Sequence, residues 1–197
     1  MTPYDYALIA NEAYSADPDI GEEDTASRAI VRTTPDGLCI AFPGTNNLAS
    51  WVADLDAIML PVDGIGHVHE GFWNAWLAIS AKVLDTIGDQ PVTLVGHSLG
   101  AAIAIMAAAM MTAAGKPPIA VYGFEPPRVS SDTGVQQLLA SVPTWLYKNG
   151  NDLVPDVPWG CYHAGALRGI GKPLLPIPNV QDHMMTRVLL ALDTGAA

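Results

Sequence analysis

The sequence predicts an α/β fold in which a mostly parallel central sheet is flanked by helices. Short apolar runs with β-type residues alternate along the chain with longer stretches whose apolar residues recur at helical spacing. Half of the residues are hydrophobic and only 15% are charged, as in globular chains with a large core. The chain has 197 residues, no internal repeat and no long linker, so we expect one domain over residues 1–197.

The first elements are a helix and a hairpin. Thr2 and Pro3 suit the N-cap and first turn of a helix that we expect to end near residue 13. Two β-type runs at 26–33 and 38–42 flank the turn sequence Thr34-Pro35-Asp36-Gly37, which predicts a hairpin.

The rest of the chain continues the alternation. Residues 71–87 carry apolar side chains at helical spacing, and Gly88 is suited to end that helix. The remaining expectations are strands at 91–95, 119–124, 144–148 and 162–167, helices at 99–114, 134–140 and 182–192, and an acidic surface loop at 17–24.

The stretch Gly96-His97-Ser98-Leu99-Gly100 lies between an apolar strand and a helix of small residues. A serine hydroxyl is a weak nucleophile, and a tight strand-to-helix turn exposes it at the top of the sheet. The two glycines leave space where the strand and the helix crowd together. The backbone N–H of Leu99 then points toward a reacting carbonyl, so this turn predicts Ser98 as a nucleophile and Leu99 as an oxyanion donor.

The charge balance excludes some partners. The net charge is −11 with only nine Lys and Arg residues, so we expect no binding to nucleic acid or to anionic lipid by charge. The apolar run 99–114 is too short and too rich in alanine to predict stable membrane insertion. We expect a monomer. No signal peptide is visible, so we expect a cytoplasmic protein or one exported by another route.

Seven short motifs occur in order between residues 38 and 183. They are Phe42-Pro43-Gly44-Thr45, Trp51-Val52-Ala53-Asp54-Leu55, Val68-His69-Glu70-Gly71-Phe72, the Gly-His-Ser-Leu-Gly turn, Pro127-Arg128-Val129, Asn151-Asp152-Leu153-Val154-Pro155 and Asp182-His183. Together they resemble the class 3 lipases, the group that includes the fungal triacylglycerol lipases. The resemblance implies an α/β-hydrolase fold and hydrolysis of carboxylic esters through an acyl-enzyme intermediate, with a small-molecule or lipid ester as substrate.

Two positions depart from the family pattern. Pro43 stands where the family usually has arginine, which affects how the loop before Thr45 is braced. Glu125 stands where the family usually has glycine, and it adds a carboxylate near the carboxyl end of a strand. Nothing in the sequence explains this second departure.

A serine nucleophile requires a base and an acid, which α/β-hydrolases place in the chain order Ser, acid, His. Asp152 follows the strand at 144–148 in a Gly-Asn-Asp loop, and His183 matches the family's base. We expect His183 to take the proton of Ser98 and Asp152 to orient its ring. The resemblance also implies that Thr45 supplies the second oxyanion donor. A plain β-turn is the alternative for Pro43-Gly44.

Other residues compete for these roles. His163 is the rival base, although it falls inside an expected strand, and Asp156 and Asp182 are rival acids that suit loop or cap positions better. His67 and His69 lack a further ligand at a known metal spacing, so we expect no metal, and no phosphate-binding loop or other cofactor motif is present.

Three functions remain open at this point. The first is a lipase or esterase. The second keeps the same triad but acts on a phospholipid, a polyester or a thioester. The third is a catalytically silent hydrolase fold used as a binding module, against which the intact serine, acid and histidine argue. We expect Trp51 of the second motif to lie partly exposed near the site. For Leu55, Ile58, Met59 and Leu60 the alternatives are contact with an acyl chain and burial in the core, and we expect the core.

Overall fold

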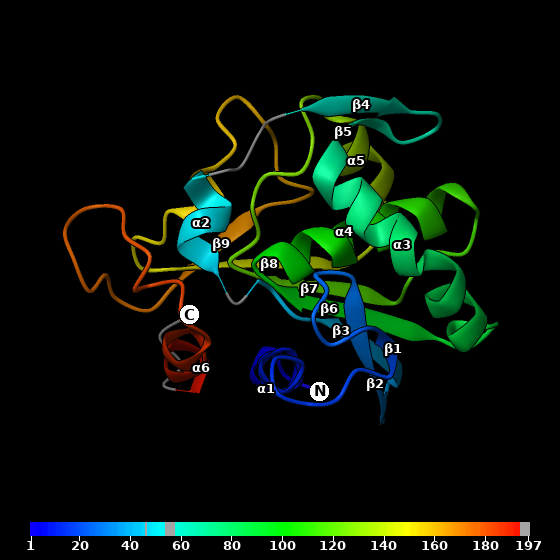
Figure 1. The fold of residues 1–197 in the computed structure, drawn as a ribbon, viewed down its shortest axis with the longest axis horizontal. Helices are drawn as coiled ribbons and strands as arrows, with labels where there is room; N and C mark the ends of the chain where they lie inside the picture. The colour runs from blue at the N-terminus through cyan, green and yellow to red at the C-terminus, as the bar shows by residue number, and fades with distance from the viewer. Residues whose placement is uncertain (46, 54–57, 194–197) are drawn as a thin grey trace.

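The computed structural model describes residues 1–45, 47–53 and 58–193. Its centre is a seven-stranded sheet in the order β1-β2-β3-β6-β7-β8-β9 (Figure 1). Strands β1 to β3 pair antiparallel, and β3, β6, β7, β8 and β9 pair parallel. The expected α/β fold with a mostly parallel sheet is confirmed. The strands are β1 (Ile20–Gly21), β2 (Arg28–Thr34), β3 (Gly37–Phe42), β4 (Met59–Val62), β5 (Gly66–His69), β6 (Val92–His97), β7 (Ala120–Phe124), β8 (Thr144–Asn149) and β9 (Leu167–Ile170).

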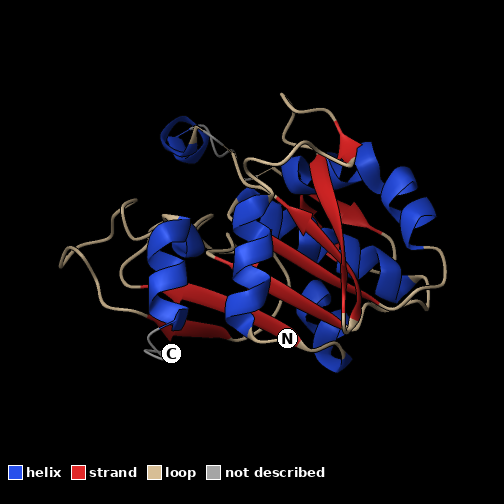
Figure 2. Ribbon diagram, turned by 90° about the horizontal axis from the view of Figure 1, so that it is seen from below, coloured by secondary structure: helices blue, strands red, loops and turns tan. Residues whose placement is uncertain are grey.

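Helices cover both faces of the sheet. Helices α1 and α6 lie side by side on one face, and α3 and α4 cover the other (Figures 1 and 2). Strands β4 and β5 form a separate antiparallel hairpin. The helices are α1 (Pro3–Glu12), α2 (Leu48–Ala53), α3 (Glu70–Ile87), α4 (Leu99–Ala113), α5 (Gly134–Leu138) and α6 (Met185–Asp193), with short 3-10 turns at Leu139–Ser141 and Val154–Asp156.

Strand alternation divides the core between the two faces. In β3, Ile40 and Phe42 pack toward α3 and α4, whereas Cys39 and Ala41 pack toward α1 and α6. A central parallel strand is buried on both sides, which explains its continuous apolar sequence. Nearly all of α4 is buried, as its alanine-rich sequence requires.

Most of the expected elements are confirmed. Thr2 caps α1 in a reciprocal capping box with Asp5, and the hairpin of β2 and β3 turns at Gly37, where φ is +114°. Helix α3 ends at Gly88 as expected. Strands at 91–95, 119–124 and 144–148 and helices at 71–87, 99–114 and 134–140 correspond to β6, β7, β8, α3, α4 and α5 within a few residues at their ends.

The strand expected at 162–167 is wrong. Tyr162 makes only an isolated bridge to Ser130, and the edge strand β9 begins at Leu167, where it pairs with Leu146 of β8. Residues 162–166 lead to the edge of the sheet without joining it. The strand β9 that follows contains Gly169, which an edge strand tolerates.

Three further expectations need correction or a limit. Part of the acidic loop, Ile20–Gly21, pairs with β2 as an edge strand, although the acidic residues after it are exposed. The last helix begins at Met185 rather than at 182, so His183 lies in the turn before it. Trp51 is half-buried against Phe72, as expected, and Leu55 lies outside the described residues. The expectation of a core position is wrong for Ile58, which is exposed, whereas Met59 is half-buried and Leu60 packs against the core.

None of the helices in the described ranges combines the length and the apolar character that a membrane span requires. Both cysteines are free thiols, with Cys39 buried and Cys161 half-buried.

Candidate active site

The turn between β6 and α4 holds Ser98 in a strained conformation. Its φ of 57° and ψ of −126° are rare for a residue with a side chain and are characteristic of a nucleophile elbow. The two glycines permit this turn, because a Cβ on Gly96 would collide with the backbone of Gly100, and one on Gly100 with that of Phe42. Ser98 N–H donates to the carbonyl of Phe124 at 2.9 Å, which fixes the turn to β7.

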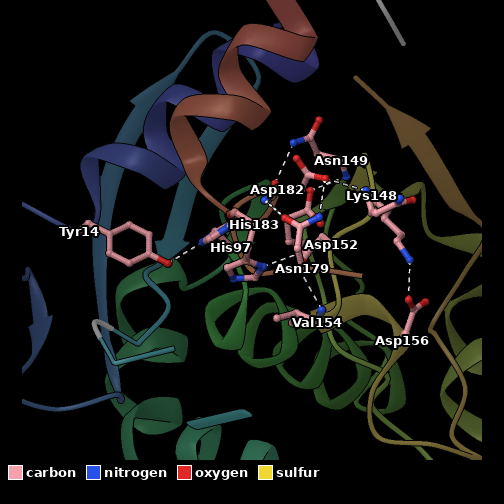
Figure 3. Close-up of polar contacts among 12 residues, drawn as sticks. Tyr14, His97, Lys148, Asn149, Asp152, Val154, Asp156, Asn179, Asp182 and His183 are labelled. Atoms are coloured by element: carbon pink, nitrogen blue, oxygen red, sulfur yellow. Dashed lines mark hydrogen bonds and ion pairs between the residues drawn. The ribbon is translucent and has the colours of Figure 1, made fainter. Parts of the chain in front are cut away.

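Asp152 and His183 form a buried pair (Figure 3). His183 Nδ1 lies 2.6 Å from Asp152 Oδ2, and the amide of Val154 donates to Oδ1 at 3.0 Å. Burial alone would raise the pKa of Asp152, but the neighbouring Glu125 and His183 and the amide of Val154 outweigh it and leave that pKa below its ordinary value. An ionised Asp152 fixes the tautomer of His183 with the proton on Nδ1 and leaves Nε2 free to accept a proton.

His97 connects His183 to the nucleophile turn. The rings of His97 and His183 lie 4.5 Å apart between centroids, and His97 Nε2 contacts the carbonyl oxygen of His183 at 2.9 Å. Ser98 Oγ and His183 Nε2 are both buried, and neither has a hydrogen-bond partner among the described residues. Nucleophile and base are therefore not hydrogen-bonded to each other in this structure, and such contacts commonly tighten only when substrate binds.

Tyr14 holds the loop before Thr45 in place. Its hydroxyl lies 2.6 Å from His97 Nδ1 and close to the backbone of Gly44, where a Cβ would collide with it. Burial and the neighbouring His183 lower the pKa of His97 to about 3, and burial raises the pKa of Tyr14. Tyr14 therefore donates to Nδ1, and His97 donates from Nε2 to the carbonyl of His183. The contact of Tyr14 with Gly44 braces the loop in which Pro43 stands in place of the usual arginine.

The two expected oxyanion donors lie on either side of this turn. Leu99 begins α4, so its backbone N–H has no partner within the helix. Thr45 is half-buried and accepts the amide of Asn47 on its Oγ1 at 3.1 Å. The structure brings the Gly44 backbone close to Ser98, since a Cβ on Gly44 would lie 2.9 Å from that of Ser98.

The rival residues are engaged elsewhere. His163 Nε2 bonds to the carbonyl of Pro155 at 2.8 Å, and Asp156 pairs with Lys148 at 2.7 Å. Asp182 is fully buried and holds neighbouring loops together. Its carboxylate accepts hydrogen bonds from the backbone amides of Asn151 and Leu174 and from the side chain of Asn179, and it forms an ion pair with Arg187. None of these three contacts Asp152 or Ser98 through a hydrogen bond in the described part of the chain.

Glu125 is the residue whose position the sequence does not explain. Its oxygen lies with the ligand atoms of Asp152 and His183 in a cluster within 4.8 Å, the spacing of a small metal site. However, two ligands of one zinc ion at about 2.0 to 2.2 Å each stand roughly 3 Å or more apart. The 2.6 Å contact of Asp152 with His183 is a hydrogen bond instead. The histidines at 67 and 69, which the sequence raised as metal ligands, do not belong to this cluster, and His67 pairs with Asp132.

A cavity of about 290 Å³ opens at this edge of the sheet. Leu48 and Met184 give its lining an apolar part. Tyr14, Thr45 and His183, which belong to the site described above, line the rest. A larger hollow of about 630 Å³ lies at the amino ends of β6 and β7. Ligands of open parallel sheets bind at the carboxyl ends, so the smaller cavity is the better substrate site.

Comparison with known proteins gives a consistent result. The family model for "Lipase (class 3)" matches residues 39–161. The secreted mono- and diacylglycerol lipase A of Penicillium cyclopium is 30% identical over 144 residues, which cover 68% of this chain and 47% of that protein. The present chain thus spans about half the length of this curated relative.

Two solved structures show the same fold. The triacylglyceride lipase of Rhizomucor miehei superposes with a TM-score of 0.67 at 22% identity, covering 85% of this chain and 78% of that one. A triacylglycerol lipase whose catalytic centre is a serine protease triad superposes with a TM-score of 0.70 at 20% identity, covering 91% of this chain and 90% of that one. The fold is that of the α/β-hydrolases, and the chain belongs to the class 3 lipase family.

Proposed function

We propose that this protein is a serine hydrolase of carboxylic esters that acts through an acyl-enzyme intermediate, and that residues 1–197 act as one catalytic domain. The observation that carries the proposal is the buried 2.6 Å contact of Asp152 with His183 beside the strained turn of Ser98. The arrangement supplies a nucleophile, a base and an oriented acid in the order found in α/β-hydrolases.

In this proposal His183 Nε2 takes the proton of Ser98 Oγ as the hydroxyl attacks the ester carbonyl. Asp152 stabilises the resulting imidazolium without becoming protonated. The amides of Leu99 and Thr45 stabilise the oxyanion of the tetrahedral intermediate. His183 then returns the proton to the leaving alcohol, and water hydrolyses the acyl-enzyme by the same steps in reverse order.

The surroundings support an apolar acyl group as the substrate. Leu48 and Met184 line the cavity, and Met184 is 56% exposed. Several further large apolar side chains stand exposed on the segment that leads to His183, namely Leu174, Leu175, Ile177 and Val180. Such a patch suits contact with a lipid. The Penicillium and Rhizomucor relatives, named as acylglycerol lipases, support a lipid ester.

The test is hydrolysis of p-nitrophenyl esters from acetate to palmitate by the wild type, Ser98→Ala and Ser80→Ala. Ser80 is a matched control, because it is half-exposed on α3 and its hydroxyl donates to the carbonyl of Leu77 in the preceding turn of the same helix. We expect Ser98→Ala to lose at least about 10⁴-fold in kcat and Ser80→Ala to keep wild-type rates.

The pattern across substrates separates the alternatives. A rate that rises on emulsified long-chain ester supports a lipase, and a preference for short soluble esters supports an esterase. Turnover only of phospholipid, polyester or thioester supports the second candidate. Absence of turnover on all of them contradicts the proposal and favours a binding module. Turnover that persists in Ser98→Ala contradicts the mechanism.

A further inference from the structure

Glu125 combines two features that destabilise a folded chain. It follows β7 directly and adopts a φ of +53°, a left-handed conformation that favours glycine and costs about 1–3 kcal/mol in other residues. Its side chain is also fully buried, and burying a carboxyl group without partners is unfavourable. The contacts of this side chain show what offsets these two penalties.

One carboxyl oxygen of Glu125 extends the sheet. The backbone N–H of Glu125 donates to the carbonyl of Tyr147 at 2.9 Å, and its Oε1 accepts the amide of Asn149 at 2.6 Å. The side chain of Glu125 thus accepts the hydrogen bond of the Asn149 amide in β8 at the point where β7 ends. Oε2, the other oxygen, is buried and receives no hydrogen bond from a donor in the described ranges.

A second buried carboxyl group lies close to that of Glu125. The carboxyl of Glu125 shares a buried cluster, within 4.8 Å, with the carboxylate of Asp152 and the ring of His183. Two carboxylates so close in a buried site do not both ionise, because each charge opposes the other. One of them holds a proton, and a protonated carboxyl group is a hydrogen-bond donor.

The surrounding charges favour the proton on Glu125. Asp152 receives His183 Nδ1 and the Val154 amide, whereas Glu125 receives one amide. Lys148, whose positive charge acts on Glu125, is paired with Asp156 at 2.7 Å. Burial, followed by the neighbouring Asp152, raises the pKa of Glu125 well above its ordinary value, and the pKa of Asp152 is lowered.

We propose that Glu125 is a positioning residue of this site, which stays protonated at neutral pH and donates a hydrogen bond from Oε2 to the carboxylate of Asp152. Asp152 then accepts hydrogen bonds from three sides, which holds it ionised and oriented toward the ring of His183. The effect on catalysis rests on the proposed ester hydrolysis, whereas the protonation of Glu125 and its hydrogen bond to Asp152 are independent of that function.

Two variants separate this role from a structural one. Glu125→Gln keeps the shape, accepts the Asn149 amide on its oxygen and donates to Asp152 from its nitrogen, so it imitates a protonated glutamate. Glu125→Gly accommodates the φ of +53° and removes both hydrogen bonds. We expect the glutamine variant to stay within about threefold of the wild-type kcat. The glycine variant should fold and lose about 10- to 100-fold in kcat, with KM within about twofold, as found when a partner orienting a functional histidine is removed.

The titration of His183 provides a readout that needs no substrate. We measure the low-field NMR resonance of its Nδ1 proton and its pKa in all three proteins. For a neutral Glu125, the glutamine variant leaves the pKa of His183 unchanged and keeps the resonance. For an ionised Glu125, glutamine removes a negative charge within 4.8 Å and lowers the pKa of His183 by more than about one pH unit.

The outcomes are distinguishable from those of the proposed function. A lowered pKa of His183 in Glu125→Gln, an equal loss of kcat in both variants, or wild-type kcat in Glu125→Gly each overturns the inference. A change of the wild-type resonance on dialysis against EDTA also overturns it, because an ion then occupies the cluster. If the wild type hydrolyses no ester but His183 titrates as expected, the proposed function fails and the role of Glu125 stands.

Discussion

At the scale of single residues, hydrogen-bond partners decide which histidine serves as the base. His183 is buried and its ring contacts the carboxylate of Asp152 at 2.6 Å, whereas His163 is half-buried and its ring bonds to a backbone carbonyl. His163 faces the carbonyl oxygen of Pro155, which holds its ring without stabilising a positive charge as an ionised Asp152 does. Burial, then the nearby Arg128, also lowers the pKa of His163 although the Pro155 carbonyl opposes this shift.

We expect His183→Ala to lower kcat by about 10⁴-fold or more with little change in KM, because the base acts in the transition state and not in substrate binding. His163→Ala is the matched control and should keep at least half of the wild-type kcat. Steady-state kinetics on a short-chain p-nitrophenyl ester measures both. Loss of turnover in His163→Ala, with His183→Ala active, would reverse the assignment.

At the scale of elements, the site depends on how α1 lies against the sheet. Tyr14 follows α1 and reaches His97 across 83 residues of sequence. Its hydroxyl also packs against Gly44, in the loop that carries Thr45. The segment after the N-terminal helix is thereby linked to the nucleophile turn and to the loop before Thr45.

We expect Tyr14→Phe to lower kcat about tenfold, because the loss of one hydrogen bond of about 1.5 kcal/mol loosens the oxyanion loop and frees the His97 ring. Tyr6→Phe is the matched control, since Tyr6 lies in α1 and bonds to Asp36 far from the site. Equal kinetics of the two variants would show that the Tyr14 contact does not support catalysis.

The sequence predicted elements where local signals suffice. The strand, the Gly-His-Ser-Leu-Gly turn and the small-residue helix follow one another within residues 91–114, so no distant contact is needed to recognise them. Tyr14 and Glu125 carry no such signal, because their roles come from contacts with segments that only the fold brings near. The strand expected at 162–167 failed for the same reason, since pairing with β8, an edge contact, sets where β9 begins.

At the scale of the whole molecule, buried titratable groups at the site connect its chemistry to its stability. His97 stays neutral in the folded protein down to about pH 3, whereas in the unfolded chain it takes up a proton below about 6.5. Its contribution to the free energy of unfolding is therefore lost as the pH falls below 6.5. The contribution of Glu125 to the free energy of unfolding changes with pH in the opposite direction and falls as the pH rises. The unfolded chain releases the Glu125 proton above about pH 4.5, whereas the folded protein keeps it.

We expect the contributions of His97 and Glu125 to oppose one another between pH 4.5 and 6.5 and to lower stability outside this window, each by up to about 1.4 kcal/mol per pH unit. Urea unfolding from pH 3.5 to 8 measures this. Glu125→Gln should remove the decline above 6.5, and His97→Gln should reduce the decline below 4.5. A decline above pH 6.5 that is unchanged in Glu125→Gln would mean that Glu125 is ionised in the folded protein.

The central claim is that Ser98 is a nucleophile activated by His183, and covalent trapping tests it most directly. We expect a fluorophosphonate to add one equivalent per chain, to be found on Ser98 by peptide mass spectrometry, and to abolish ester hydrolysis in proportion to labelling. In His183→Ala the labelling should slow by about 10³-fold or more, because the base is gone. Labelling of another residue, or full inhibition with Ser98 unmodified, would contradict the account.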